Sequence, residues 1–364
     1  MDFALEPTAA AVGDVADEVM RRLQPDWESK FVEGVGGFDH AAWEALVGAG
    51  VTVLPLPESL GGDDLPIDAL VPLLTRAGHD AVVAPLIGTL VSGLVLAQSG
   101  TDVSARARSI AEGGWYAVAI GEAGRALGRR PALTLTDTAD GARLDGVKTG
   151  VLAADGAAAI LVVADRGVTV VPTDAAGLTI TRTPSSSGQG EYTLVFDGVA
   201  VAAADLVADD PQPAVDAYRA LLAAYADGLV AGAIKRTAEH VSTRHQFGKP
   251  IAAFQAVGQQ LADVYVVSRT MNLVATAAAW AIANDADPQE DLATAMYWVS
   301  AELPATLRTM THLHGGVGVD VTYPLHRYFS LVKDVARLAG GAHHTLDVLT
   351  DETVPAVQEA LACS

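Results

Sequence analysis

The feature that most constrains the fold is a change in hydrophobic period that occurs twice, because helices and strands need different spacings of apolar residues. The first part has helical spacing, as in AAWEALVGAG, where Trp43, Leu46 and Val47 share one face. From Gly113, short runs rich in Val, Thr and Ile alternate with turn sequences such as ADG and DAAG. From Pro213 the segments are long and helical again. The pattern predicts an α+β chain with three regions.

We expect an N-terminal helical domain over residues 1–112, a central antiparallel β-barrel or sandwich over 113–208, and a C-terminal helical bundle over 209–364. Four long helical segments with short connections favour an antiparallel four-helix bundle. One of them should kink at Pro304. The stretch SSSGQG, which begins at Ser185, is of low complexity and is expected to be a flexible loop.

The chain is strongly acidic, with 23 basic against 44 acidic residues and a formal net charge of −21. Such a chain repels nucleic acid and anionic membranes, so neither is expected as a partner. It would also repel a polyanionic ligand unless basic residues gather locally. The positions of the Arg and Lys residues therefore indicate where such a ligand could bind.

The composition also bears on location. A single cysteine, Cys363, excludes a disulfide within the chain and suits a reducing cytoplasm. The first residues carry acids rather than the basic region of a signal peptide. The apolar run from Leu86 is short and contains Gly and Ser, so it is expected to be a buried helix rather than a membrane span. We therefore expect a cytoplasmic protein.

One segment, RHQFGKPIAAFQAVGQQLADV from Arg244, suits the binding of a nucleotide diphosphate. Arg244, at the end of a long predicted helix, offers a forked guanidinium. Phe247 can pack against an adenine or a ribose, and Gln255 offers amide donors and acceptors. The alternative is that Arg244 only caps the helix.

A second segment, HLHGGVGVDVTYPLHRYFSLVKD, begins at His312. Gly315 and Gly316 lie in its Gly-Gly-x-Gly turn, where the absence of a Cβ allows the backbone to approach a ligand closely. The alternative is that these glycines only turn the chain. The turn follows a predicted helix and no Lys-Ser/Thr comes after it, so it is neither a P-loop nor a Rossmann motif.

Together the two segments resemble the C-terminal domain of acyl-CoA dehydrogenases. That family has an Arg-x-x-Phe-Gly turn, a helix with Phe-Gln, a Gly-Gly-x-Gly turn, Tyr-Pro and an Arg-Tyr-Phe segment. The stretch WEALVGAGVTVLPLPESLGG looks like the family's first domain, so the resemblance covers nearly the whole chain. It implies FAD as the cofactor. The ADP half would be held by Arg244, Phe247, Gln255, His312, Gly315 and Gly316, and the flavin would lie in a neighbouring subunit.

The chain departs from the family where the catalytic base should be. Counting from Arg327-Tyr328-Phe329, the family's glutamate position holds Ala339, which cannot accept a proton. Some members carry the base near the start of the first bundle helix, and that position here is Tyr218. Tyrosine, with an ordinary pKa of about 10, is a poor base at neutral pH. We predict no catalytic residue at either position.

The flavin-facing segments depart as well. The family's Thr-Glu-Pro-x-x-Gly-Ser-Asp loop corresponds loosely to Gly121-Glu122, followed here by RALGRR. The family's Lys-x-Trp-Ile-Thr strand corresponds to a stretch beginning at Lys148, in which Gly150 stands in place of the tryptophan. The features that would face the flavin and act as base are therefore missing together.

This combination resembles the non-catalytic subunit of the α2β2 acyl-CoA dehydrogenases that degrade steroids in actinobacteria. The resemblance implies a homologous partner subunit with the catalytic Glu, an acyl-CoA substrate bound mainly by that partner, and little activity of this chain alone. Two alternatives remain open. One is a self-sufficient homo-oligomeric enzyme whose base is not identified, and the other is a non-enzymatic scaffold of the same fold.

The histidines are the remaining candidates for metal ligands. His312 and His314 are close in sequence, as are His343 and His344, but neither pair has cysteines or clustered carboxylates beside it. We predict that the chain has no metal site.

Overall fold

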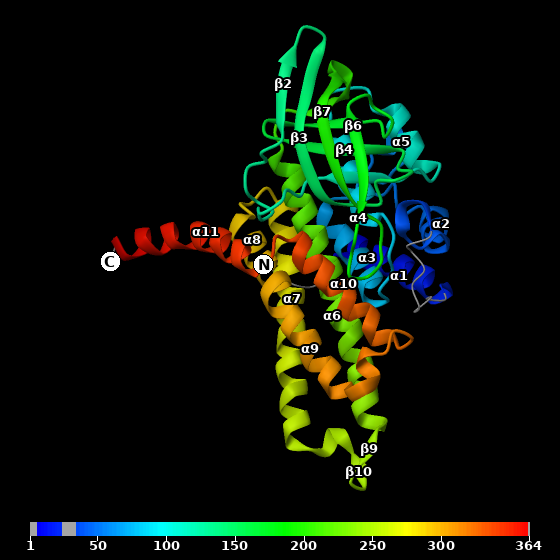
Figure 1. Cartoon of the computed structure of the whole chain (residues 1–364), viewed down its shortest axis with the longest axis vertical. Helices are drawn as coiled ribbons and strands as arrows, with labels where there is room; N and C mark the ends of the chain where they lie inside the picture. Colours follow the sequence, from blue (N-terminus) through cyan, green and yellow to red (C-terminus); the bar gives the residue numbers. More distant parts are fainter. Residues whose placement is uncertain (1–5, 24–33, 363–364) are drawn as a thin grey trace.

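A computed structural model describes residues 6–23 and 34–362, with side chains as far as residue 353. Cys363 lies outside the described residues. The predicted order of helices, strands and helices is confirmed. The β region lies at one end of the molecule, the N-terminal helices beside its middle, and the long C-terminal helices run to the other end (Figure 1). That each region folds as an independent domain stays a prediction.

The N-terminal region packs its helices into one large core together with the C-terminal helices. The apolar run from Leu86 is mostly buried in α4, as expected. The helices of this region are α1 (Pro7–Arg22), α2 (His40–Gly48), α3 (Ile67–His79), α4 (Leu86–Ala97) and α5 (Ser104–Ala111).

The central region contains two four-stranded sheets, whose inner faces share a second hydrophobic core. One sheet has the order β1-β4-β5-β8 and the other β2-β3-β7-β6. The strands are β1 (Tyr116–Ala119), β2 (Thr134–Thr138), β3 (Gly141–Leu152), β4 (Ala159–Ala164), β5 (Gly167–Val171), β6 (Leu178–Thr183), β7 (Glu191–Ala202) and β8 (Leu206–Ala208).

This region corrects the prediction in two respects. The sheets do not close on each other, so the barrel alternative is wrong and the sandwich is right. The pairing is also not wholly antiparallel, because β1 runs parallel to β4, with Tyr116 opposite Ala159. These strands are separated by β2 and β3, which belong to the other sheet, and a pairing over such a distance leaves no local signal in the sequence.

The C-terminal region has four long helical segments, as predicted, followed by a helix that leads away from the bundle (Figure 1). The four segments are α6 (Gln212–Thr243), α7 (Gln255–Ala283), α8 (Gln289–Tyr297) continued by α9 (Leu303–His314), and α10 (Pro324–Leu338). The helix that follows them is α11 (Ala342–Ala362). A short hairpin, β9 (His245–Gln246) and β10 (Lys249–Pro250), joins α6 to α7.

The irregularity expected at Pro304 lies just before it. A π-helical turn, Trp298–Glu302, joins α8 to α9. Proline has no N–H, and its ring would clash with the carbonyl four residues earlier, at Ser300. The wider π-helical turn over these residues makes room for the proline, which cannot donate the usual backbone hydrogen bond.

Candidate functional site

The hairpin after α6 holds Arg244 and Phe247 at the far end of the bundle from the β-sheets (Figure 1). Arg244 ends the helix with an extended backbone, and its N–H donates to His240 O at 2.8 Å. Phe247 lies at the hairpin tip with a φ of 51° and is 91% exposed. A left-handed backbone disfavours an aromatic residue, and water disfavours its exposed ring. The hairpin therefore presents Phe247 outward at a cost in stability.

The Gly-Gly turn is tied to α6 by a pair of stacked histidines. His314, the last residue of α9, stacks on His240 with 4.2 Å between the ring centroids. Its Nε2 lies 3.2 Å from Thr237 Oγ1. Because that hydroxyl donates to Ala233 O, the ring nitrogen must be the donor. Burial, with the charge of His240 as a smaller cause, lowers the pKa of His314 to about 4, so the ring is neutral.

Gly315 and Gly316 follow this anchored histidine and face open space. Gly315 has a φ of 67°, and no atom lies within 4 Å of a Cβ built on either glycine. The backbone of the turn is therefore accessible to a ligand. His314 stacks on His240, which lies one helical turn before Arg244 on α6. The structure therefore brings the two predicted segments to the same end of the bundle.

The predicted nucleotide contacts share exposure to solvent. Arg244, Gln255 and His312 are all exposed, and Arg244 makes no salt bridge within the described residues. Lys249 adds a second cation, with its Nζ 4.2 Å from the centroid of the Phe254 ring. In a chain of net charge −21, this local gathering of basic groups suits a polyanion. The donor set fits the ADP half of FAD.

The two segments that by resemblance would face the flavin ring are joined here by an internal ion pair. Lys148 Nζ lies 2.7 Å from Glu122 Oε1 and also donates to Ile120 O, and the lysine side chain is fully buried. Glu122 accepts two further hydrogen bonds, from the N–H groups of Ala132 and Leu133. Burial opposes the charge on Glu122, but the hydrogen bond and charge of Lys148 outweigh it and lower its pKa. The pair closes residues 120–122 onto β3.

Gly150 of β3 and Leu338 of α10 pack against each other beside this ion pair. A Cβ on Gly150 would lie 2.7 Å from Leu338 Cδ2. The cavity that remains there measures about 40 Å³ and is lined by Gly121, Gly150, Tyr218 and Leu338, among others. A cavity of this size is far below the several hundred Å³ of a typical ligand pocket. The residues therefore do not fit a flavin ring in this chain's own cleft.

Both positions considered for the base are buried, although Tyr218 lines the two small cavities. Ala339 is fully buried. The next residue, Gly340, packs so closely that a Cβ there would lie 2.5 Å from Ala126 Cα. Tyr218 is 5% exposed, and burial raises the pKa of its hydroxyl. Its neighbour Asp216 accepts hydrogen bonds from Gln289 and Gln212, so this carboxylate is engaged elsewhere.

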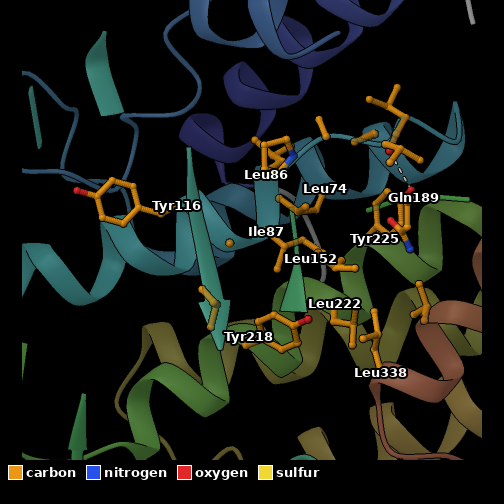
Figure 2. A pocket seen from close by; sticks show the side chains of 18 residues that line it. Leu74, Leu86, Ile87, Tyr116, Leu152, Gln189, Tyr218, Leu222, Tyr225 and Leu338 are labelled. Atoms are coloured by element: carbon orange, nitrogen blue, oxygen red, sulfur yellow. Dashed lines mark hydrogen bonds between the residues drawn. The ribbon is translucent and has the colours of Figure 1, made fainter. Parts of the chain in front are cut away.

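A mostly apolar cavity lies where the N-terminal helices, β1, β3 and the bundle meet (Figure 2). It measures about 50 Å³, well below the several hundred Å³ of a typical ligand pocket. Among the described residues, the polar side chains that line it are Tyr116, Tyr218, Tyr225 and Gln189. This lining includes no carboxylate or thiol, so the cavity offers neither the room nor the base for thioester chemistry.

The loop predicted to be flexible is in fact fastened to α10. Asp334 accepts hydrogen bonds from the N–H groups of Ser186 and Ser187, at 2.7 and 2.9 Å, and from the Ser187 hydroxyl at 2.7 Å. Gln189 also donates to it at 3.4 Å. Arg337, one turn later, pairs with Glu191 at the start of β7. The prediction failed because composition cannot reveal a carboxylate that arrives from 147 residues further along the chain.

The role of Asp334 in fixing this loop was not predicted, although its place in the sequence indicated that the carboxylate needs partners. It lies on the face of α10 that buries Leu331 and Val335, and a charged residue on a buried face needs partners. No group of three or more metal-ligating side chains occurs within the described part of the chain. The rings of His343 and His344 lie 5.8 Å apart, and His344 Nδ1 donates to Gly340 O at 3.1 Å.

A family model and two known proteins that are similar to this chain are all described as acyl-CoA dehydrogenases. Residues 212–346 match the family model described as acyl-CoA dehydrogenase, C-terminal domain. The chain is 43% identical to the acyl-CoA dehydrogenase FadE28 of Mycobacterium tuberculosis, over 96% of this chain and 98% of that protein. It is 32% identical to FadE27 of the same organism, over 94% and 96% of the two chains.

Among solved structures, the chain is similar to one in the crystal structure of the ChsE4-ChsE5 complex from Mycobacterium tuberculosis. The TM-score is 0.87 at 32% identity, covering 97% of this chain and 99% of that one. A structure described as a variant of the Tcur3481-Tcur3483 steroid ACAD gives a TM-score of 0.86 at 31% identity, covering 96% and 98%.

Proposed function

The chain belongs to the acyl-CoA dehydrogenase family, and we propose that within it this chain completes an FAD site in a homologous subunit without supplying the catalytic base. The observation that carries the proposal is the contrast between its two half-sites. The nucleotide-binding end is exposed, whereas the flavin and acyl end is filled by side chains of the same chain. One FAD is then bound for every two chains.

The nucleotide-binding end of the bundle could also contact a partner subunit. Phe247, Val319 and Val321 are 91%, 67% and 61% exposed, and Val317 is 38% exposed. Exposed apolar side chains on the hairpin and on the turn after α9 favour a contact that is later covered. A homologous subunit that brings its flavin to this end would cover them. The ChsE4-ChsE5 neighbour is described as a complex of two such proteins, which supports a heteromeric assembly for this chain.

The roles of this chain's residues follow from their chemistry. The Arg244 guanidinium and the open backbone of Gly315 and Gly316 would hold the diphosphate of FAD. Phe247 packs on the adenosine, while Gln255 and His312 hydrogen-bond its polar edges. When bound, FAD accepts the hydride that leaves the β-carbon of the acyl thioester. The α-proton is removed by a glutamate of the partner subunit, since the corresponding position here is Ala339.

We propose acyl-CoA thioesters as the substrates of the assembly, bound mainly by the partner. Steroid side-chain CoA esters are the specific class, because one structural neighbour is described as a steroid enzyme of this kind. The assembly is an α2β2 heterotetramer in the cytoplasm. Its reaction is α,β-dehydrogenation, and this chain alone is inactive.

The decisive experiment compares this chain purified alone with the chain co-expressed with a homologous subunit that carries the glutamate. We expect a colourless lone chain and a yellow complex, with one FAD per two chains by absorbance and mass. A yellow lone chain with one FAD each would support a self-sufficient enzyme. A complex without flavin would favour a scaffold.

A further inference from the structure

A groove lies along the end of α4 and the start of α6, at the opposite end of α6 from the nucleotide-binding hairpin. Two adjoining cavities form it, since Val95, Gln98 and Pro213 line both. The first measures about 340 Å³ and the second about 620 Å³, against about 50 and 40 Å³ for the two small cavities beside Tyr218. Cavities of several hundred Å³ are large enough to hold a ligand or the side chains of a partner. We call the two together the α4–α6 groove.

The floor of the α4–α6 groove consists of small and aliphatic side chains. Ile67 and Val95 are buried in the first cavity, and Val207 and Ala214 in the second. Among the described residues, no aromatic side chain lines either cavity. Such a floor suits a side chain with a long aliphatic stem, because it covers the methylene groups and leaves a polar head at the rim.

The rim of the groove carries carboxylates. Asp64 and Asp285, both exposed, line the first cavity, and Asp209 and Asp210 line the second. Asp64 and Asp285 have φ angles of 52° and 53°, a left-handed backbone that aspartate tolerates and most residues avoid. Within the described residues neither of these two makes a salt bridge. No Lys, Arg or His of the described chain lines either cavity, so the negative charge of the groove is not compensated.

Two helix ends add to this negative charge. α4 ends at Ala97 and α7 ends at Ala283, and both residues line the first cavity. The C-terminal end of a helix has unpaired carbonyls and a partial negative charge, which favour a nearby cation. The start of α6, beside the second cavity, has the opposite polarity, but there Asp210 accepts a hydrogen bond from the Gln212 N–H at 3.0 Å. The first cavity is therefore the better place for a cationic head.

We propose that the α4–α6 groove docks a basic segment of a partner protein, with a Lys or Arg head in the first cavity and aliphatic side chains along the floor. The charge of the groove selects this occupant. A second copy of this chain, with its net charge of −21, is a poor match, and the acidic rim repels nucleic acid and anionic membranes.

The segment belongs to a protein other than the homologous subunit that is proposed to share FAD. The nucleotide-binding hairpin follows the C-terminal end of α6, whereas the groove lies at its N-terminal end. α6 has 32 residues and is therefore about 48 Å long. The homologous subunit can bind at one end of α6 while the groove stays open at the other. The docking of the segment does not rest on the proposed role in FAD binding.

A model peptide tests the groove, both in the complex co-expressed with the homologous subunit and in the lone chain. The probe is a short fluorescent peptide of alternating Lys and Leu, and its binding is measured by anisotropy. We expect it to bind to both proteins and to bind more weakly as salt is added, because salt screens exposed charges. A peptide of alternating Glu and Leu has the same apolar side chains but is acidic, and it should not bind.

Two substitutions at the rim test the role of charge. Asp64→Asn together with Asp285→Asn removes both carboxylates and keeps a residue type that tolerates the left-handed backbone. This double variant should bind the Lys-Leu peptide about tenfold more weakly, since two exposed ion pairs are lost. Asp140→Asn together with Asp174→Asn, both exposed in turns of the β region, makes the same change in net charge and should have no effect.

A substitution in the floor tests the role of shape. Ala97→Trp places a large side chain in the first cavity without changing the charge, and it should also weaken binding of the Lys-Leu peptide. A thermal melt like that of the wild type would show that this variant folds normally.

Four results would overturn the proposal. One is absence of binding of the Lys-Leu peptide to the wild type. Equal weakening by the rim variant and its control would show that only net charge attracts the peptide. Equally tight binding of the Glu-Leu peptide would show that the groove takes any apolar segment. Binding to the lone chain but not to the complex would identify the homologous subunit as the cover of the groove. Flavin content is a separate measurement, so none of these outcomes decides the proposed function.

Discussion

Leu338 occupies the space that a side chain on residue 150 would need, because a Cβ on Gly150 would lie 2.7 Å from Leu338 Cδ2. The end of α10 thus closes against β3. By resemblance, the family places a tryptophan on that strand and the flavin ring beside it. The contact explains how one chain can keep the family fold and still exclude the flavin from its own cleft.

Removing the exposed cation should release the cofactor from the assembly. Arg244→Ala is expected to lower the FAD content of the co-expressed complex by about tenfold or more, because charge-assisted hydrogen bonds contribute about 1.5–3 kcal/mol. The measurement is flavin absorbance per complex after denaturation. Arg108→Ala, at an exposed position on α5, is the control. Unchanged flavin in Arg244→Ala would favour the scaffold alternative.

Restoring the missing base should not restore an enzyme. Ala339 is fully buried, so Ala339→Glu places a carboxylate in the core and should destabilise the fold by about 3 kcal/mol or more. Ala339→Gln separates the effect of size from that of charge. Burial raises the pKa of the new carboxyl above its unfolded value, so its extra penalty over Gln should fade as the pH drops below about 4. Flavin bleaching by acyl-CoA with the lone Ala339→Glu chain would contradict the prediction.

Two adjacent glycines should respond differently to the same substitution. Gly340 and Gly341 both have positive φ, 112° and 78°, so alanine strains the backbone at either position by about 1 kcal/mol. Of the two, Gly340 is the position where the new Cβ would also meet another backbone, that of Ala126 at 2.5 Å. Gly340→Ala should therefore lower the free energy of unfolding by about 2 kcal/mol more than Gly341→Ala. Equal losses in denaturant titrations would show that α10 does not seal the cleft.

The buried histidine should make stability depend on pH. Burial lowers the pKa of His314 to about 4 from an unfolded value of 6.5, so the folded chain binds fewer protons. Its contribution is present above pH 6.5 and is lost as the pH falls towards 4. His314→Gln should flatten the stability profile in that window, whereas His312→Gln, at an exposed position, should leave it unchanged. Thermal melts of the lone chain from about pH 4 to 7 supply the comparison.

Much of the architecture could be predicted because it depends on properties local to the chain. The period of apolar residues separates helices from strands within a few turns, and it predicted the order of helices, strands and helices. Residue identity is equally local. Ala339 cannot accept a proton in any conformation, so it can be excluded as a base without coordinates. The nucleotide-binding set followed from the resemblance to the family's motifs, and its role stays a proposal.

What the tertiary structure decided rests on contacts between distant residues. The loop over residues 185–190 was predicted to be flexible, but Asp334 fastens it from 147 residues away. The parallel pairing of β1 with β4 and the contact of Gly150 with Leu338 are equally non-local. Such contacts depend on how helices and sheets pack, because the energy of each arises only when both partners meet. The sequence by itself showed that neither expected position carries a base, and only the folded chain showed that its cleft is filled.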